Sequence, residues 1–223
     1  VRGVLSMVLA MAESGIKRCF LAEENVAEGI AADCLDIIRI RSLQEIIELL
    51  NGTGKLRIEK DQGFCAADTN YSVDFSEVNG QRLMRRATEV AVAGGHNLLY
   101  IGPPGSGKSM MARRIPTIMP ALSREEQLEV SKVYSICGML PKDHALIGTR
   151  PYRAPHHTIS AQALTGGGLW PKPGEISLAS RGVLFLDELA EFEKRTHWKN
   201  IRLRYPASMA AFRFRRISCW RRH

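Results

Sequence analysis

A short stretch beginning at Gly102 has the residue types and the spacing needed to hold phosphate groups. It reads Gly102-Pro103-Pro104-Gly105-Ser106-Gly107-Lys108-Ser109 and matches the pattern GxxxxGK[ST] at every fixed position. Glycines let successive backbone N–H groups turn inward and surround phosphate oxygens. Lys108 can reach the β- and γ-phosphates of a nucleotide, and the Ser109 hydroxyl can ligate Mg²⁺. These residues predict a phosphate-binding loop, for which the alternative is a Gly-rich turn that matches by chance.

Two acidic residues further along the chain could complete such a site. Asp187 and Glu188 follow the four apolar residues 183–186. An all-apolar run is typical of a parallel strand buried on both faces, and nucleotides bind at the carboxyl ends of such strands. We expect Asp187 to hold the hydration shell of Mg²⁺ and Glu188 to polarise the water that attacks the γ-phosphate. A strand that runs into an acidic turn is common, so the assignment depends on the phosphate-binding loop in the same domain.

The segments around these residues predict an α/β domain with a parallel sheet. An apolar strand over 97–101 precedes the loop, and a helix begins at Lys108, so that the positive end of its dipole faces the phosphates. A helix over 81–93 and a helix from the capping box at Ser123 flank this unit. Residues 148–182 are rich in Gly, Pro and Thr, which indicates turns and hairpins.

A separate α/β layer precedes this domain. We expect helices over 4–13, 24–32 and 43–50 and strands over 18–21 and 36–40. The polar, Gly-rich residues 53–73 then form a linker.

Composition and cysteine usage limit the class of protein. The chain has 223 residues, of which 45% are apolar and 24% are charged, so it can bury a core, and no apolar window is long enough to span a membrane. Five cysteines without a CxxC pair favour reduced thiols in the cytoplasm over a disulfide framework or a zinc site. The short apolar run after Arg2 imitates a signal peptide, but we favour the start of a fragment.

The net charge of +8 is confined to the end of the chain. Residues 197–223 hold eight Lys or Arg and no acidic residue, so the remaining residues are electrically neutral. Nucleic-acid binding by charge alone would therefore fall to this tail.

Three histidines could in principle bind a metal or take part in catalysis. His156 and His157 are adjacent, and adjacent residues on a strand or loop point apart. No Cys or carboxylate lies nearby at ligand spacing, so a structural role is favoured over a metal site. His96 is expected to serve in a turn rather than in catalysis.

Three segments resemble one family. They are GGHNLLYIGPPGSGKS, RPYRAPHHTISAQALTGGG and PKPGEISLASRGVLFLDELAEF, and they are similar to the magnesium-chelatase-like AAA+ ATPases of the ComM/YifB type. The resemblance covers about residues 1–196. It implies that residues 1–52 are the end of a Lon-protease-like domain, that 74–196 are the AAA+ core with its entry segment at 74–78, and that 150–182 are insert hairpins facing a central pore.

The resemblance implies an ATP hydrolase that uses Mg²⁺ and assembles as a homo-oligomeric ring. The ComM branch is associated with DNA branch migration during transformation, and the chelatase branch inserts Mg²⁺ into a porphyrin. A chelatase chain needs no Lon-like leader, so residues 1–52 favour a motor that acts on DNA. The third hypothesis is a non-catalytic protein that binds ATP without hydrolysing it. For this chain we expect nucleotide binding with little turnover.

The resemblance is expected to end at Thr196. Residues 212–223, back-translated and read from the third base of each codon, allow Pro-Phe-Pro-Ala-Asn-Phe-Met-Leu-Ala-Ala, which is like the family's FPA-FML-AA segment. We therefore predict that residues 197–223 are out of frame and disordered. The alternative is a genuine basic tail that binds nucleic acid.

Overall fold

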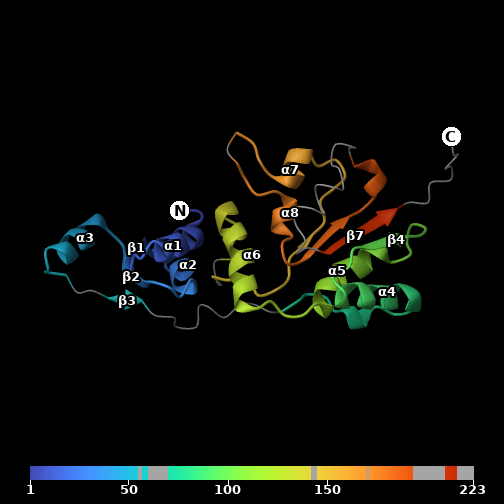
Figure 1. The fold of residues 1–223 in the computed structure, drawn as a ribbon, viewed down its shortest axis with the longest axis horizontal. Coiled ribbons are helices and arrows are strands. Elements are labelled where there is room, and N and C mark those ends of the chain that lie inside the picture. Colours follow the sequence, from blue (N-terminus) through green and yellow to red (C-terminus); the bar gives the residue numbers. More distant parts are fainter. Residues whose placement is uncertain (55–56, 60–69, 142–144, 170, 193–208, 215–223) are drawn as a thin grey trace. The chain divides into compact units, whose positions relative to one another are not determined.

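The structure is a computed structural model that describes residues 1–54, 57–59, 70–141, 145–169, 171–192 and 209–214. The chain divides into two compact units (Figure 1). The first contains Val1–Thr69 and Ser123–Gly148, and the second contains Asn70–Leu122 and Thr149–His223. Each unit is described by itself.

The first unit is a small α/β layer. Helix α1 (Val4–Glu13) leads into β1 (Arg18–Ala22), the short helices η1 (Glu23–Asn25) and α2 (Val26–Ala31), and β2 (Asp36–Ile40). Strands β1 and β2 pair in parallel, and β3 (Ile58–Glu59) pairs antiparallel with β2. The predicted helix at 24–32 is therefore a 3-10 turn followed by a shorter α-helix, while the strand over 36–40 is found as expected.

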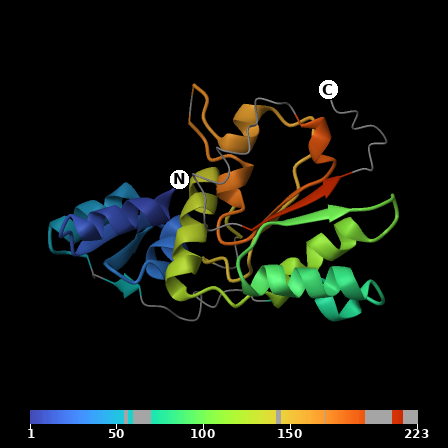
Figure 2. The ribbon, with the colours of Figure 1, turned by 45° about the vertical axis from the view of Figure 1, so that its right-hand side comes forward.

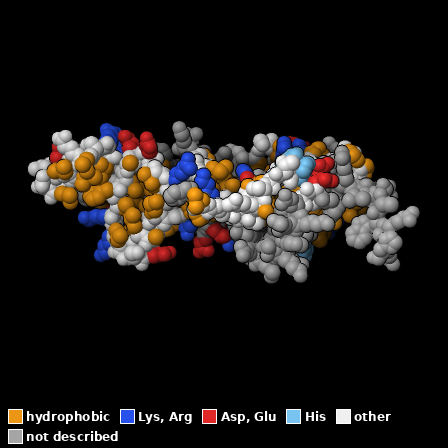
Figure 3. Space-filling model, turned by 90° about the horizontal axis from the view of Figure 1, so that it is seen from above, with side chains coloured by type: hydrophobic (Ala, Val, Ile, Leu, Met, Phe, Trp, Pro, Cys, Tyr) orange, Lys and Arg blue, Asp and Glu red, His pale blue; other side chains and the backbone are white. Residues whose placement is uncertain are grey.

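Helix α3 (Leu43–Leu50) begins at the predicted cap, but only half of the capping box forms. The Ser42 hydroxyl accepts a hydrogen bond from the amide of Glu45, while the Glu45 carboxylate accepts one from the amide of Arg41 instead of that of Ser42. The helix has no buried residue, and Leu43 and Leu50 are each more than 70% exposed. Figure 3 shows hydrophobic side chains gathered on the surface of this unit.

Helix α6 (Arg124–Cys137) belongs to the first unit, although the sequence placed it within the ATPase core at 74–196. Its capping box at Ser123 and Glu126 is complete, so its start follows from local sequence. Its packing depends on distant residues: the Ser135 hydroxyl donates to the Glu28 carboxylate at 2.6 Å, and the Arg124 guanidinium donates to the carbonyl of Ala31 at 2.7 Å.

The second unit is built on a parallel sheet of four strands in the order β4-β7-β6-β5. The strands are β4 (Leu98–Ile101), β5 (Tyr152–Arg153), β6 (Val183–Leu186) and β7 (Met209–Phe214). Helices α4 (Arg82–Ala93) and α5 (Lys108–Ile118) lie on one side of this sheet, and α7 (Ala161–Thr165) and α8 (Glu175–Leu178) lie on the other (Figure 2). The predicted parallel sheet is confirmed.

Strand β6 is buried on both faces, which explains its unbroken apolar sequence. Val183 and Phe185 pack in one cluster with Met111 and other residues of α5. Leu184 and Leu186 pack in another with residues from α7 and α8, including Leu164. Because successive side chains of a strand point to opposite faces, all four positions must be apolar.

The segment between β5 and β6 contains more helix than the predicted hairpins. Besides α7 and α8 it has one antiparallel bridge, between Gly167 and Lys172, among the residues that the structure describes. Gly166, Gly167 and Gly168 all have positive φ, a backbone conformation that favours glycine.

The structure differs from the expected disordered tail at Met209–Phe214. These residues form β7, which pairs in parallel with β4 on one side and β6 on the other. Five of these six residues are apolar, a composition that suits a strand lying between two others in a sheet. The rest of the tail lies outside the described residues, and the reading-frame hypothesis stays a prediction.

Candidate nucleotide-binding site

The loop between β4 and α5 has the backbone conformation that its glycines predict. Gly105 and Gly107 adopt φ of 77° and 79°, in the left-handed region. Gly107 is the N-cap residue of α5, and the Ser106 hydroxyl donates to the carbonyl of Pro103 at 2.9 Å. The loop therefore ends at a helix N-terminus, where the helix dipole favours an anion.

Lys108 is held against the loop by hydrogen bonds from its ammonium group. Its Nζ donates to the carbonyl of Gly102 at 3.0 Å, to the Ser106 hydroxyl at 2.7 Å and to the carbonyl of Pro103. The residue is only 4% exposed. The charge of this buried residue is partnered by oxygens of the loop.

Ser109 and Asp187 meet although they are 78 residues apart in the sequence. The Ser109 hydroxyl donates to Asp187 Oδ2 at 3.3 Å. Asp187 follows β6, and Ser109 follows the loop after β4, so both lie at the carboxyl edge of the parallel sheet. A hydroxyl beside a carboxylate is a set of hard oxygen donors of the kind that Mg²⁺ prefers.

Glu188 lies beside Asp187 in a constrained backbone conformation. Its φ is 52°, which is uncommon for a residue other than glycine, and its amide donates to Asp187 Oδ1 at 2.9 Å. Its carboxylate Oε2 is 3.5 Å from Nδ1 of His157. From the sequence alone we expected only a structural role for His157, because its contact with Glu188 depends on the pairing of β5 with β6.

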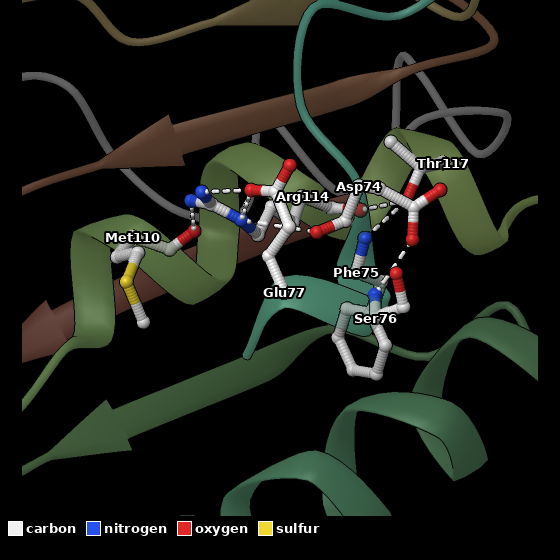
Figure 4. A network of polar contacts seen from close by, with 7 residues as sticks. All are labelled: Asp74, Phe75, Ser76, Glu77, Met110, Arg114 and Thr117. Atoms are coloured by element: carbon white, nitrogen blue, oxygen red, sulfur yellow. Dashed lines mark hydrogen bonds and ion pairs between the residues drawn. The ribbon is translucent and has the colours of Figure 1, made fainter. Parts of the chain in front are cut away.

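The entry segment is tied to α5 by a network of polar contacts (Figure 4). Arg114 of α5 donates to the Glu77 carboxylate and, through Nε, to the carbonyl of Asp74 at 3.1 Å. The amide of Phe75 donates to the Thr117 hydroxyl at 3.1 Å. Hydrogen bonds from the hydroxyl and the amide of Ser76 lower the pKa of Asp74. Residues 74–77 are thereby fixed to the helix that begins at the phosphate-binding loop.

Two tyrosines lie in the interior near the site. Burial raises the pKa of Tyr100 to about 12, against the opposing effect of its hydrogen bond with Thr88, at 2.7 Å. Partial burial raises the pKa of Tyr152 to about 12, and Asp187 adds to the rise while Arg113 opposes it. Both phenols are therefore neutral near neutral pH.

The described part of the chain offers no alternative metal centre. Within it, no group of three or more His, Cys, Asp or Glu residues could hold a metal ion. No described helix has the length and apolar character required to cross a membrane. Among the described cysteines, Cys19, Cys34 and Cys137 are free thiols.

The loop, the acidic edge and the parallel sheet define a P-loop nucleotide-binding fold of the AAA+ class. The chain belongs to the family described as magnesium chelatase, subunit ChlI, whose model matches residues 74–218. The predicted family is confirmed. The match extends beyond Thr196, so the prediction that the similarity ends there is wrong.

The chain is also similar to curated bacterial proteins. It is 39% identical over 199 residues to competence protein ComM of Haemophilus influenzae and 41% identical over 196 residues to the uncharacterised protein YifB of Escherichia coli. These matches cover 87% and 88% of the chain but only 38% of each relative. Among solved structures, NtrX from Brucella abortus with ADP gives a TM-score of 0.41 at 14% identity, covering 95% of this chain and 46% of that one.

Proposed function

We propose that the second unit binds ATP with Mg²⁺ and hydrolyses it. The observation that carries the proposal is the meeting of Ser109 and Asp187 beside the loop that holds Lys108. The backbone N–H groups of Gly105, Ser106 and Gly107 and the Lys108 ammonium would bind the phosphates, in exchange for the oxygens that Lys108 contacts within the loop.

The donor set fits a magnesium ion. Ser109 and Asp187 would hold it, and when bound it would neutralise charge on the phosphates. The oxygens of these two side chains already lie within hydrogen-bond distance, so little rearrangement is needed to bring both toward one cation.

Glu188 is the proposed general base. Its carboxylate would accept a proton from water as the water oxygen attacks the γ-phosphate and the bond to the leaving ADP oxygen breaks. The fixed backbone at Glu188 supports this role, since a base must lie within hydrogen-bond reach of the proton it removes.

We further propose that the ATPase is part of a cytoplasmic ring motor that acts on DNA, with residues 150–182 as its pore-facing insert. The similarity to ComM supports this over the chelatase alternative. It spans 199 of the 223 residues and therefore includes residues before 74, which lie outside the match to the chelatase model at 74–218. The second candidate function is that of a chelatase subunit that acts on a porphyrin, because the family model is described as magnesium chelatase, subunit ChlI.

The experiment is phosphate release from ATP with Mg²⁺, measured alone and with branched DNA, duplex DNA or a metal-free porphyrin. Glu188→Gln is the reference for background release. Stimulation by branched DNA above duplex DNA would support the motor, and stimulation by porphyrin alone would support the chelatase. Release no faster than in Glu188→Gln under every condition, with ATP bound, would leave a binding remnant and overturn the hydrolysis proposal.

A further inference from the structure

We propose that His157 is a positioning residue that holds the Glu188 carboxylate in place for proton transfer. The inference rests on the proposed ATPase function. His157 Nδ1 and Glu188 Oε2 are 3.5 Å apart, and each side chain is 29% exposed. Figure 3 shows histidine and acidic side chains next to each other on the face it presents. A contact that is partly withdrawn from solvent is screened less than one on an open surface.

The strand register explains why these two residues meet. Strands β5 and β6 pair in parallel, with Arg153 opposite Leu184. His157 lies four residues beyond Arg153, and Glu188 lies four residues beyond Leu184. Because the paired strands end at the same edge of the sheet, the segments that follow them emerge side by side.

The backbone of Glu188 fixes the start of its side chain but not its end. The left-handed φ and the hydrogen bond to Asp187 Oδ1 set the direction of the Cα–Cβ bond. A glutamate still rotates about three further bonds, and ordering such a side chain costs conformational entropy. A partner at the carboxylate reduces this freedom, and His157 is in position to be that partner.

His157 is itself supported by its surroundings. The rings of His156 and His157 do not point apart as expected but lie 4.0 Å from each other, and His156 Nδ1 is 3.0 Å from the Thr158 hydroxyl. At the base of the segment, the Arg153 guanidinium donates two hydrogen bonds to the Glu175 carboxylate, at 2.6 and 2.7 Å. An imidazole braced in this way can hold one carboxylate oxygen while the other accepts a proton.

The test compares three substitutions of His157 by single-turnover phosphate release and by calorimetric binding of ATP with Mg²⁺. His157→Ala removes the partner. His157→Asn keeps an amide nitrogen near the place of Nδ1, whereas His157→Gln carries its amide further out, toward the place of Nε2. His96→Ala, at the exposed turn before β4, is the matched control.

His157→Ala should slow hydrolysis about 10-fold, a part of the 10²–10⁴-fold that a positioned base contributes. Its affinity for ATP should stay within about twofold of the wild type, because His157 contacts the base and not the phosphate-binding loop. His157→Asn should recover most of the rate, His157→Gln should recover less, and His96→Ala should match the wild type. Thermal unfolding of each variant checks that the fold is retained.

The outcomes separate this inference from the function on which it rests. If Glu188→Gln stops turnover but His157→Ala does not slow it, the positioning role is refuted and the ATPase stands. An equal loss of rate and affinity in His157→Ala, with no recovery in His157→Asn, would also refute it in favour of a structural role. If Glu188→Gln hydrolyses ATP like the wild type, the base has been assigned wrongly and the proposed function fails first.

Discussion

Replacing Lys108 by alanine should weaken nucleotide binding strongly, because it removes the cation at the centre of the loop. In the structure the ammonium is surrounded by Gly102 O at 3.0 Å, Ser106 Oγ at 2.7 Å and the carbonyl of Pro103. We expect ATP to take the place of these partners. The charge would then pass from neutral oxygens to phosphate oxygens without becoming more exposed to water than its present 4%.

The size of the effect follows from the two sets of contacts. One pair of unit charges at 4 Å is worth about 4 kcal/mol at an effective dielectric constant of ~20, and the β- and γ-phosphates together carry more than one charge. Two phosphate charges in reach give an attraction of about 8 kcal/mol, and giving up the three hydrogen bonds in the loop, at about 1.5–2 kcal/mol each, offsets about 5–6 kcal/mol of it. A net loss of roughly 2–3 kcal/mol remains, which corresponds to an increase of about 30- to 150-fold in the Kd.

The assay is isothermal titration calorimetry with ATP and Mg²⁺. Arg82→Ala, at the exposed first residue of α4, removes one positive charge from the same unit and serves as the control. Lys108→Met keeps the apolar stem and separates loss of charge from loss of packing, because Lys108 is buried. Thermal unfolding shows whether each variant is folded. Equal ATP affinity in folded Lys108→Met and the wild type would refute the assignment of the loop.

Three further predictions concern the acidic edge, the buried phenols and the last strand. Glu188→Gln should still bind ATP but release phosphate about 10²–10⁴-fold more slowly, since an amide cannot accept the proton. Asp187→Asn should instead raise the Mg²⁺ concentration needed for half-maximal binding of ATP. Equal Mg²⁺ titrations for the wild type and Asp187→Asn would contradict the assignment of Asp187 to the metal. The pKa of Tyr100 and of Tyr152 is about 12 in the fold and about 10 when unfolded, so the stability that depends on their neutral forms is complete below pH 10 and is lost as the pH rises toward 12, by about 2 kcal/mol each. Tyrosinate absorbance and denaturant unfolding, each measured against pH, test this expectation. A titration of all tyrosines near pH 10 would contradict it. Deleting residues 197–223 removes β7, which pairs at four positions with β4 and at four with β6. The deletion should lower the free energy of unfolding by an amount on the order of 4 kcal/mol. Unchanged denaturant unfolding would instead support the predicted out-of-frame tail.

The sequence determined those features that depend on local chemistry. The positions of the glycines in 102–107 require positive φ at Gly105 and Gly107, and both have it. The four apolar residues 183–186 predicted a strand buried on both faces, and all four are buried. The capping residues at Ser42 and Ser123 predicted where two helices start, because a cap bonds to backbone groups only three residues away.

Only the tertiary structure decided which distant residues meet. The sequence contains Ser109, Asp187, His157 and Glu188, but the parallel pairing of strands that are far apart in the chain brings them to one edge. Composition identified 209–214 as part of a basic tail, yet the place between two strands is defined by the sheet and not by the segment itself. The packing of α6 within the first unit likewise depends on contacts between segments distant in sequence, which local patterns do not encode.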